Sequence, residues 1–582
     1  MKDFFRIFRV LYKNRYAVAK ESNTGRRKLP QSTVMLLSML PLVALVCVLL
    51  GFAAAQLTTR YSAMTLLNAI LSAVQLFILF MMLPTVLGTL YSSEDNAFLA
   101  SLPVSPTAVF FAKLALCYVA ALKTAAVFLI PSLLTVSVTY AAFGNPMFYG
   151  FFPLIAVIVA AAPLLPLFIV VLFSMPVMWI GSFLKGRSVV RTVFSLLFYI
   201  LLMAAYMVFI FFVNTEGLGQ NGGETLSEGA LEALALLSQV MYPNSVLLSM
   251  CMGIDAAENF GISLAIWIVL GAVTVLLAML FYRRITSKQS ESHPEESGAK
   301  RSYRRTKLVP ALMKRDFLSV MRNPSMAMGT FSNIILAPIV MAVMFFFMRG
   351  DAEEASMSAL AGEIMMQGIV LLYAIIFLCG TNMVAMTAYS REGESFFISK
   401  FLPIPPKSSV TAKLLFSVSA AAVSLVIMLV LAVALYGIDP GAAFALLTAA
   451  LLFCAGTSAL HIYFDIKKGN VHWKSQSDMR ANAGGGVTAL IPVLLSIAPA
   501  VLFVVMGIFM AALEDSIGRS GVLALYWSIV NVVAAAVAAA GLYILYDKGV
   551  PLYDKIGENR APSVKKQRRS LFAAGGKDGF LK

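Results

Sequence analysis

Charged residues are scarce in this chain of 582 residues, because Asp, Glu, Lys and Arg together make up only 13% of it. Soluble domains use about 25% charged and about 45–50% apolar residues. Here 60% of the residues are hydrophobic, and apolar runs of about 20 residues, long enough to cross a bilayer, recur along the chain. The sequence therefore predicts an all-α integral membrane protein and excludes a soluble one.

Cysteine and histidine are also rare, with five and three residues respectively. The cysteines are isolated and form no metal-binding spacing and no evident disulfide pair. The histidines are too scattered to form a ligand set. We therefore expect neither a metal nor a cofactor.

Catalytic motifs are missing as well. The chain contains no G-x-x-x-x-G-K-[ST] phosphate loop, no H-E-x-x-H and no G-x-S-x-G. Its one run of three glycines, at 484–486, is not followed by Lys-Ser or Lys-Thr. We expect that this chain is not an enzyme and that it does not bind ATP in the P-loop manner.

What the chain does contain is one loop sequence in two copies. The first copy reads YSSEDNAFLASLPVSPTAVFFAKL at 91–114, and the second reads YSREGESFFISKFLPIPPKSSVTAKL at 389–414. The match continues beyond a two-residue insertion in the second copy. It predicts that one membrane unit was duplicated and fused. The matched pairs include Glu94 with Glu392, Phe98 with Phe396, Pro103 with Pro403 and Lys113 with Lys413.

The apolar runs predict twelve transmembrane helices, arranged as two parallel six-helix repeats, each preceded by an amphipathic interfacial helix. We expect the first repeat at 1–285, a cytoplasmic linker at 286–306, the second repeat at 307–547 and a basic cytoplasmic tail at 548–582. The interfacial helices are expected at 1–20 and 308–322. The first six spans are expected at 34–55, 64–90, 113–139, 150–173, 192–213 and 262–283, and the second six at 326–348, 364–389, 411–436, 442–464, 487–511 and 522–546. Four prolines make the span at 150–173 the least regular and favour a broken helix there.

Basic residues give the orientation of these spans. The net charge is +16, yet only Arg60, Arg349 and Arg519 fall on the predicted outer side. The positive-inside rule therefore places both termini in the cytoplasm of a multi-pass protein of the cell membrane. This distribution follows membrane topology, so the positive charge does not indicate a nucleic-acid partner.

Lys123 is the one charge well inside an apolar run. A charge in that position is costly, which makes it a candidate for function. The alternative, which we favour, is a lysine that faces the bundle interior or reaches toward an interface.

Several of these features resemble those of a known family. The amphipathic start, the six spans and the L-P-V-S-P…A-K-L loop are similar to the membrane subunits of type-2 ABC exporters, and in particular to long bacterial permeases with two fused six-span units. The segment 464–482, with FDIKK, His472-Trp473 and MRAN, resembles a cytoplasmic motif of that group.

The resemblance implies that the repeated loops are coupling elements on which separate ATP-binding subunits dock, two copies in all. The residues it implies for docking are Glu94, Phe98, Pro103, Glu392, Phe396 and Pro403. Membrane lipid would surround the spans, and the substrate stays open. A plain turn between helices is the simpler interpretation of the loops, although a turn alone would not need the matched acids and aromatics.

Two other classes of function stay open on the sequence. An ion-coupled secondary transporter can also be built from two parallel six-span repeats, but it usually needs intramembrane acids or histidines, or broken helices. No acidic residue sits deep in any predicted span. A membrane protein of assembly or signalling, which transports nothing, is the third class.

Overall fold

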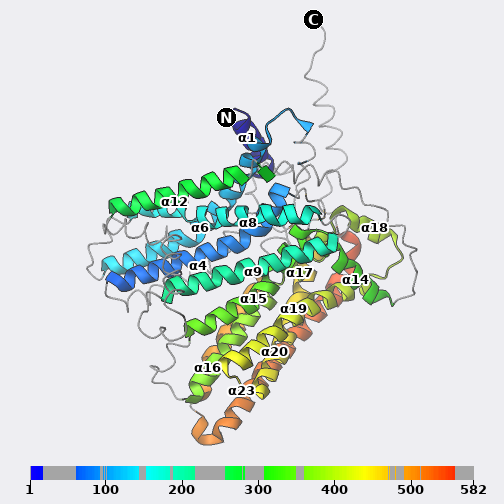
Figure 1. Ribbon diagram of the computed structural model, residues 1–582. Helices are drawn as coiled ribbons and strands as arrows, with labels where there is room; N and C mark the ends of the chain where they lie inside the picture. Colours follow the sequence, from blue (N-terminus) through cyan, green and yellow to red (C-terminus); the bar gives the residue numbers. More distant parts are fainter. Residues whose placement is uncertain are drawn as a thin grey trace, which may run out of the picture.

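The computed structural model describes residues 2–16, 60–91, 101–142, 152–183, 188–215, 256–277, 307–348, 359–469, 490–511 and 513–556, with a few isolated positions between them. Every regular element in these ranges is a helix (Figure 1). The predicted span at 34–55 and the linker at 286–306 lie outside the described residues, apart from isolated positions in the former.

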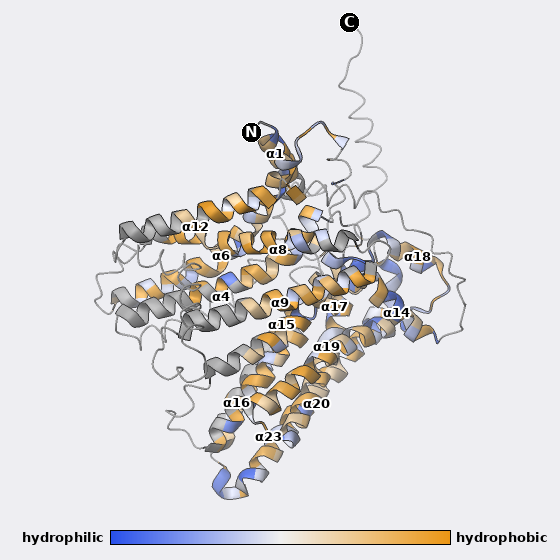
Figure 2. Cartoon of the chain, in the orientation of Figure 1, coloured by the Kyte–Doolittle hydropathy of each residue, from blue (hydrophilic) through white to orange (hydrophobic). Residues whose placement is uncertain are grey.

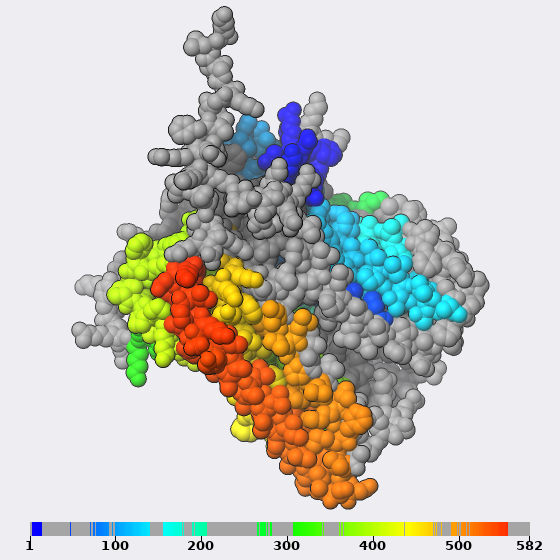
Figure 3. Space-filling view, turned by 180° about the vertical axis from the view of Figure 1, so that it is seen from behind, coloured from blue at the N-terminus to red at the C-terminus, as the bar shows by residue number. Residues whose placement is uncertain are grey.

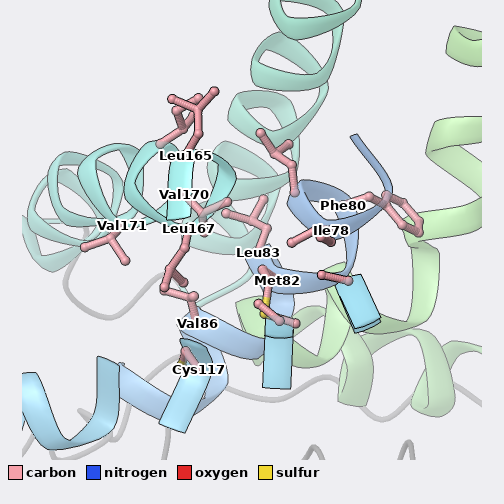
Figure 4. Packing of buried hydrophobic residues seen from close by; sticks show 14 of the residues in the cluster. Ile78, Phe80, Met82, Leu83, Val86, Cys117, Leu165, Leu167, Val170 and Val171 are labelled. Carbon is pink, nitrogen blue, oxygen red and sulfur yellow. The ribbon is translucent and has the colours of Figure 1, made fainter. Parts of the chain in front are cut away.

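The described residues of the first half contain the following helices. They are α1 (Lys2–Tyr16), α4 (Arg60–Val86), η1 (Leu87–Tyr91), α6 (Pro106–Ala142), α7 (Phe152–Ala161), α8 (Leu164–Phe183), α9 (Ser188–Thr215) and α12 (Ala256–Leu277). Buried side chains of α4, α6 and α8 converge in the core of this half, as Val86, Cys117 and Val170 show (Figure 4).

The second half contains more elements. They are α14 (Leu308–Met321), α15 (Pro324–Met348), α16 (Ala359–Ala374), η5 (Ile375–Gly380), α17 (Met383–Met386), η6 (Ser390–Ser395), α18 (Phe396–Phe401), α19 (Pro406–Tyr436), α20 (Pro440–Lys468), α22 (Leu490–Ala511), α23 (Glu514–Tyr543), η8 (Ile544–Gly549) and η9 (Val550–Lys555). The predicted tail at 548–582 begins with helical residues, which extend to Lys555. Tyr553 and Ile556 are buried there.

Among the described residues, six helical stretches are long and apolar enough to cross a membrane. They are Pro106–Thr139, Ile155–Pro176, Met366–Phe401, Pro406–Leu435, Pro440–Lys468 and Glu514–Lys555. Apolar residues cover most of the helices, whereas hydrophilic ones gather around α14 and α18 and again at the far tip of α23 (Figure 2). The bundle therefore has two polar ends separated by an apolar middle.

The proline-rich segment is divided between α7 and α8, where the prediction favoured a break. Pro166 has no amide hydrogen to offer the carbonyl of Ala162, and the Gln75 side-chain amide donates to that carbonyl instead, at 3.1 Å. The Tyr118 hydroxyl donates to the carbonyl of Ala160 at 2.9 Å. Side chains from α4 and α6 thus replace hydrogen bonds that the helix loses at the break.

The two halves meet where α15 packs against α9 and α4. Met328 and Leu336 of α15 belong to the hydrophobic core of the first half. The Ser325 hydroxyl donates to the Pro84 carbonyl at 3.1 Å in a buried contact. Seen from behind, the first half (blue and cyan) and the later helices (orange and red) lie on opposite sides (Figure 3).

The described residues of the second half form two large hydrophobic clusters. One lies among α16, α19, α20, α22 and α23. The other lies at the ends of α19 and α20, where it includes Tyr389, Phe396, Ile466, Leu545 and Tyr553. Because α19 and α20 run through both clusters, they connect the middle of the bundle to its polar end.

Helices α20 and α23 approach each other unusually closely. A Cβ atom built on Gly541 would lie 2.3 Å from the Gly456 carbonyl oxygen, and one on Gly456 would lie 2.6 Å from the Val537 carbonyl oxygen. Only hydrogen fits at these two positions, so the backbones of the two helices are in direct contact.

Candidate functional site

The second copy of the repeated loop forms a compact structure that we call the connector, residues 389–405. It comprises the short helix η6, the helix α18 and an extended segment from Leu402 to Pro405. Gly393 within η6 has a φ of 57°, a left-handed conformation that favours glycine. Helix α18 ends two residues before Pro403.

Lys413, at the start of α19, lies at the centre of a buried charge cluster. Its Nζ atom is 3.0 Å from Asp316 Oδ2 and 2.5 Å from Glu392 Oε1, and it donates to the Ala388 carbonyl at 2.7 Å. The ammonium also lies 4.7 Å from the centre of the Tyr389 ring. This one lysine therefore ties the interfacial helix α14 to the connector.

Arg315 of α14 adds a second link. Its guanidinium lies 3.2 Å from Glu392 Oε1, and it donates to Ser399 Oγ at 3.0 Å. Ser399 in turn donates to Glu392 Oε2 at 3.1 Å. Both oxygens of Glu392 are thus occupied by groups of this chain.

The cluster changes the pKa of its members in α14. Burial alone would raise the pKa of Asp316, but the charges of Lys413, Arg391 and Arg315 and the hydrogen bond from Lys413 lower it below the ordinary value. Burial would lower the pKa of Arg315, but Glu392 and Asp316 raise it overall. Both groups therefore stay charged near neutral pH.

Asp465, near the end of α20, holds the other side of the connector. Its Oδ2 atom accepts from the amides of Tyr389 at 2.7 Å and Ser390 at 3.0 Å, and its Oδ1 atom accepts from the Ser390 hydroxyl. Trp473 donates from its indole nitrogen to the Ser390 carbonyl at 2.7 Å. The carboxylate thus satisfies free amides at the start of η6.

The connector has an inner and an outer face. Phe396 is fully buried, and its ring packs edge-on against the rings of Tyr389 and Tyr553. On the outer face, Ile398 is 64% exposed and Phe401 89% exposed, and Leu402 follows at 49%. The outer face of the connector is therefore apolar and uncovered, although it lies at a polar end of the bundle.

The predicted docking residues divide between these faces. Glu392 has only 11% of its side chain exposed and Phe396 has none, so both make internal contacts. Pro403 and, in the first half, Pro103 are exposed. Glu94 and Phe98 lie outside the described residues. The docking role of all six residues stays a prediction, and the observed contacts of Glu392 and Phe396 are internal.

The first half shows a related arrangement. Helix α1 packs on α6 through Ile7, Val109 and Ala112, as α14 packs on α19 in the second half. Lys113 is buried and donates to the Asn96 side chain. Lys123, the predicted intramembrane charge, is half-buried on α6.

The sequence pointed to the loop and, by resemblance, to the segment 464–482 that contains Asp465 and Trp473, but it did not reveal that this segment and Asp316 hold the loop. Asp316, Asp465 and Trp473 come from distant segments, and nothing in their local spacing reveals a contact with the connector. A signal did exist for Lys413, because Lys113 and Lys413 occupy matched positions in the two copies.

These features define a multi-pass helical membrane protein with a charged, apolar-faced element at one end. Residues 307–464 match the model of a family described as ABC-2 type transporter, and this stretch contains the connector and the whole cluster around Lys413. The match supports a type-2 ABC transporter permease. No match to a curated protein was found.

Asp316 gives the site a predictable response to acid. Replacing Asp316 with asparagine is expected to lower the free energy of unfolding at pH 7 by about 1.5–3 kcal/mol, the usual contribution of a hydrogen bond to a charged group. Because the folded pKa lies below the ordinary value of about 3.9, the wild-type advantage is full above about pH 4 and is lost as pH falls through the folded pKa.

Thermal unfolding of the purified protein and the variant between pH 7 and pH 3 measures this difference. Asp439→Asn, which changes an exposed helix cap at the other end of the bundle, is the control. An Asp316→Asn difference that does not shrink below pH 4 would contradict the assignment.

Proposed function

We propose that this chain is the membrane subunit of an ABC exporter and that separate ATP-binding subunits drive it by docking on the connector. The observation that carries the proposal is the exposed apolar face of Ile398, Phe401 and Leu402, set on a base that internal ion pairs hold in place. The family match favours this function over an ion-coupled secondary transporter.

The finer architecture belongs to the same proposal. Twelve spans in two parallel repeats would give each half its own docking element, one for each of two ATPase subunits. The packing of α1 on α6 and of α14 on α19 supports such a repeat. The charge distribution supports cytoplasmic termini in the cell membrane, and export is the direction that the family resemblance implies.

The connector would transmit the closure of the ATPase subunits to the helices in the membrane. Closure of the ATPase subunits would press on the outer face of α18, and the ion pairs of Glu392 would carry that force to α14 and α19. The two halves, which meet at α15 and α9, would then rock against each other and change access to a central pathway.

Phe401 is the residue on which the docking surface can be tested. Truncating Phe401 to alanine is expected to weaken ATPase binding by about 2 kcal/mol or more, equal to about 30-fold, because a large exposed aromatic is a typical binding hot spot. The measurement is co-purification of an ATP-binding subunit from native membranes, followed by titration of that subunit on the isolated permease.

Phe444→Ala provides a matched control. Phe444 is 65% exposed near the start of α20, at the opposite end of the bundle. It should leave binding unchanged. Equal binding by Phe401→Ala and the wild type, or the absence of any stoichiometric ATPase in the wild-type preparation, would overturn the proposed function.

A further inference from the structure

The connector follows α16 in sequence, but the chain is interrupted between them. Thr381 and Asn382 have ψ values of 31° and 91°, outside the helical range. The ring of His461, on α20, makes a hydrogen bond of 2.8 Å with the Gly380 carbonyl, the last residue before the interruption. Asn333 of α15 donates to the Thr381 carbonyl at 2.9 Å. Other helices therefore satisfy the backbone at this point.

Beyond the interruption, the chain is attached to α19 and α20. The Asn382 amide donates to Ser458 Oγ at 3.1 Å and to the Ser417 carbonyl at 3.3 Å, and its oxygen caps the amide of Val384 at 3.1 Å. These contacts begin the short helix α17, which packs on α19 and α20. Helix α16, in contrast, packs chiefly on α22.

The attachment is closest at Ser390. Its amide and hydroxyl are bound by Asp465, and its carbonyl is bound by Trp473. The Trp473 ring also covers Gly393, where a Cβ atom would lie 3.1 Å from the ring. Gly469, at the end of α20, leaves no room for a side chain, since a Cβ atom there would lie 2.5 Å from Ser390 Oγ. The end of α20 and the start of the connector therefore form one closely packed unit.

We propose that Asp465 and Trp473 are positioning residues that fasten the connector to α20, so that it moves with α19, α20 and α23 and not with α16. Helix α20 is continuous for 29 residues, and its backbone contact with α23 at Gly456 and Gly541 joins those two helices. The interruption at Thr381 and Asn382 is then the point where α16 and α22 separate from this moving body. The attachment stands on the contacts alone, while its consequence for transport rests on the proposed function.

Hydrogen exchange on the isolated permease tests the attachment without any partner. Asp465→Asn is expected to raise amide exchange in a peptide covering 389–401 by about tenfold, because it removes the negative charge that strengthens the bonds from two amides and puts an NH2 donor in place of one acceptor oxygen. Trp473→Phe, which removes the indole N–H and part of the ring that covers Gly393, is expected to raise it about threefold. Asp439→Asn, at the opposite end of the same helix, should leave this peptide unchanged. Unchanged exchange in both site variants would overturn the proposal.

A distance measurement then tests which helices move. Spin labels at Phe444→Cys on α20 and Phe509→Cys on α22, both exposed, report the separation of the two bodies in a background with Cys47 and Cys251 replaced by serine. With the ATPase subunit bound, ATP should change this distance in the parent, and Asp465→Asn should abolish the change while the ATPase stays bound. An invariant distance in the parent, or a change that persists in Asp465→Asn, would overturn the proposal. A lack of any ATPase partner would refute the proposed function alone, since the exchange experiment decides the attachment independently.

Discussion

Replacing Lys413 with methionine is expected to lower the free energy of unfolding by about 3–5 kcal/mol, the usual cost of removing one partner from a buried ion pair. The side chain of Lys413 is 2% exposed and those of Asp316 and Glu392 are 4% and 11% exposed, so water cannot replace the lost ammonium. Methionine keeps most of the volume of lysine, so the loss reports the charge and not a cavity. Thermal or denaturant unfolding of the purified protein measures it.

Lys407→Met is the matched control, because Lys407 is exposed at the start of the same helix. It should change stability by less than about 0.5 kcal/mol. Combining Lys413→Met with Asp316→Asn and Glu392→Gln should recover part of the loss, since no buried carboxylate is then left without its cation. Full stability of Lys413→Met alone would show that the cluster contributes little.

The second large effect is expected at the crossing of α20 and α23. Adding a single methyl group in Gly541→Ala should destabilise the protein by about 3 kcal/mol, the upper part of the usual range for overpacking, because the obstacle is backbone and cannot rotate away. The expected readout is a lower unfolding temperature together with increased hydrogen exchange in both helices.

Gly271→Ala is the control for this substitution. Gly271 is also helical, in α12, but a Cβ atom there meets nothing within 4 Å. Alanine should therefore be neutral or stabilise the helix by up to about 1 kcal/mol. Similar effects at the two positions would mean that helix propensity, and not the close crossing, decides the outcome at Gly541.

Much of the helical organisation could be predicted from the sequence, because apolar runs and proline positions are local signals. The break near Pro163 follows from a missing amide hydrogen, which is a property of proline itself. The interruption at Thr381 and Asn382 gives no comparable signal. It exists because Asn333 and His461, from other helices, satisfy its backbone, and single-sequence patterns do not reveal such contacts.

The sequence singled out the repeated loop but did not indicate its contacts. Matched acids, aromatics and lysines in the two loops indicated a shared role, and the same pattern is equally compatible with internal pairing. Glu392 pairs with Lys413, and Phe396 packs on Tyr553, a residue that the sequence placed in a tail. Whether a residue of the connector is buried or exposed depends on the distant segments that cover its inner face, and the local sequence does not contain this information.

The contact with the end of the chain also constrains how the protein is made. Lys400 donates to the carbonyls of Asp554 and Ile556, and Tyr553 closes the aromatic cluster around Phe396. During synthesis, the connector leaves the ribosome long before these residues exist. Its core can therefore be completed only after translation has passed Ile556, when the later helices are already in the membrane. A chain truncated before Tyr553 would lack one ring of the aromatic cluster and both carbonyls that Lys400 binds.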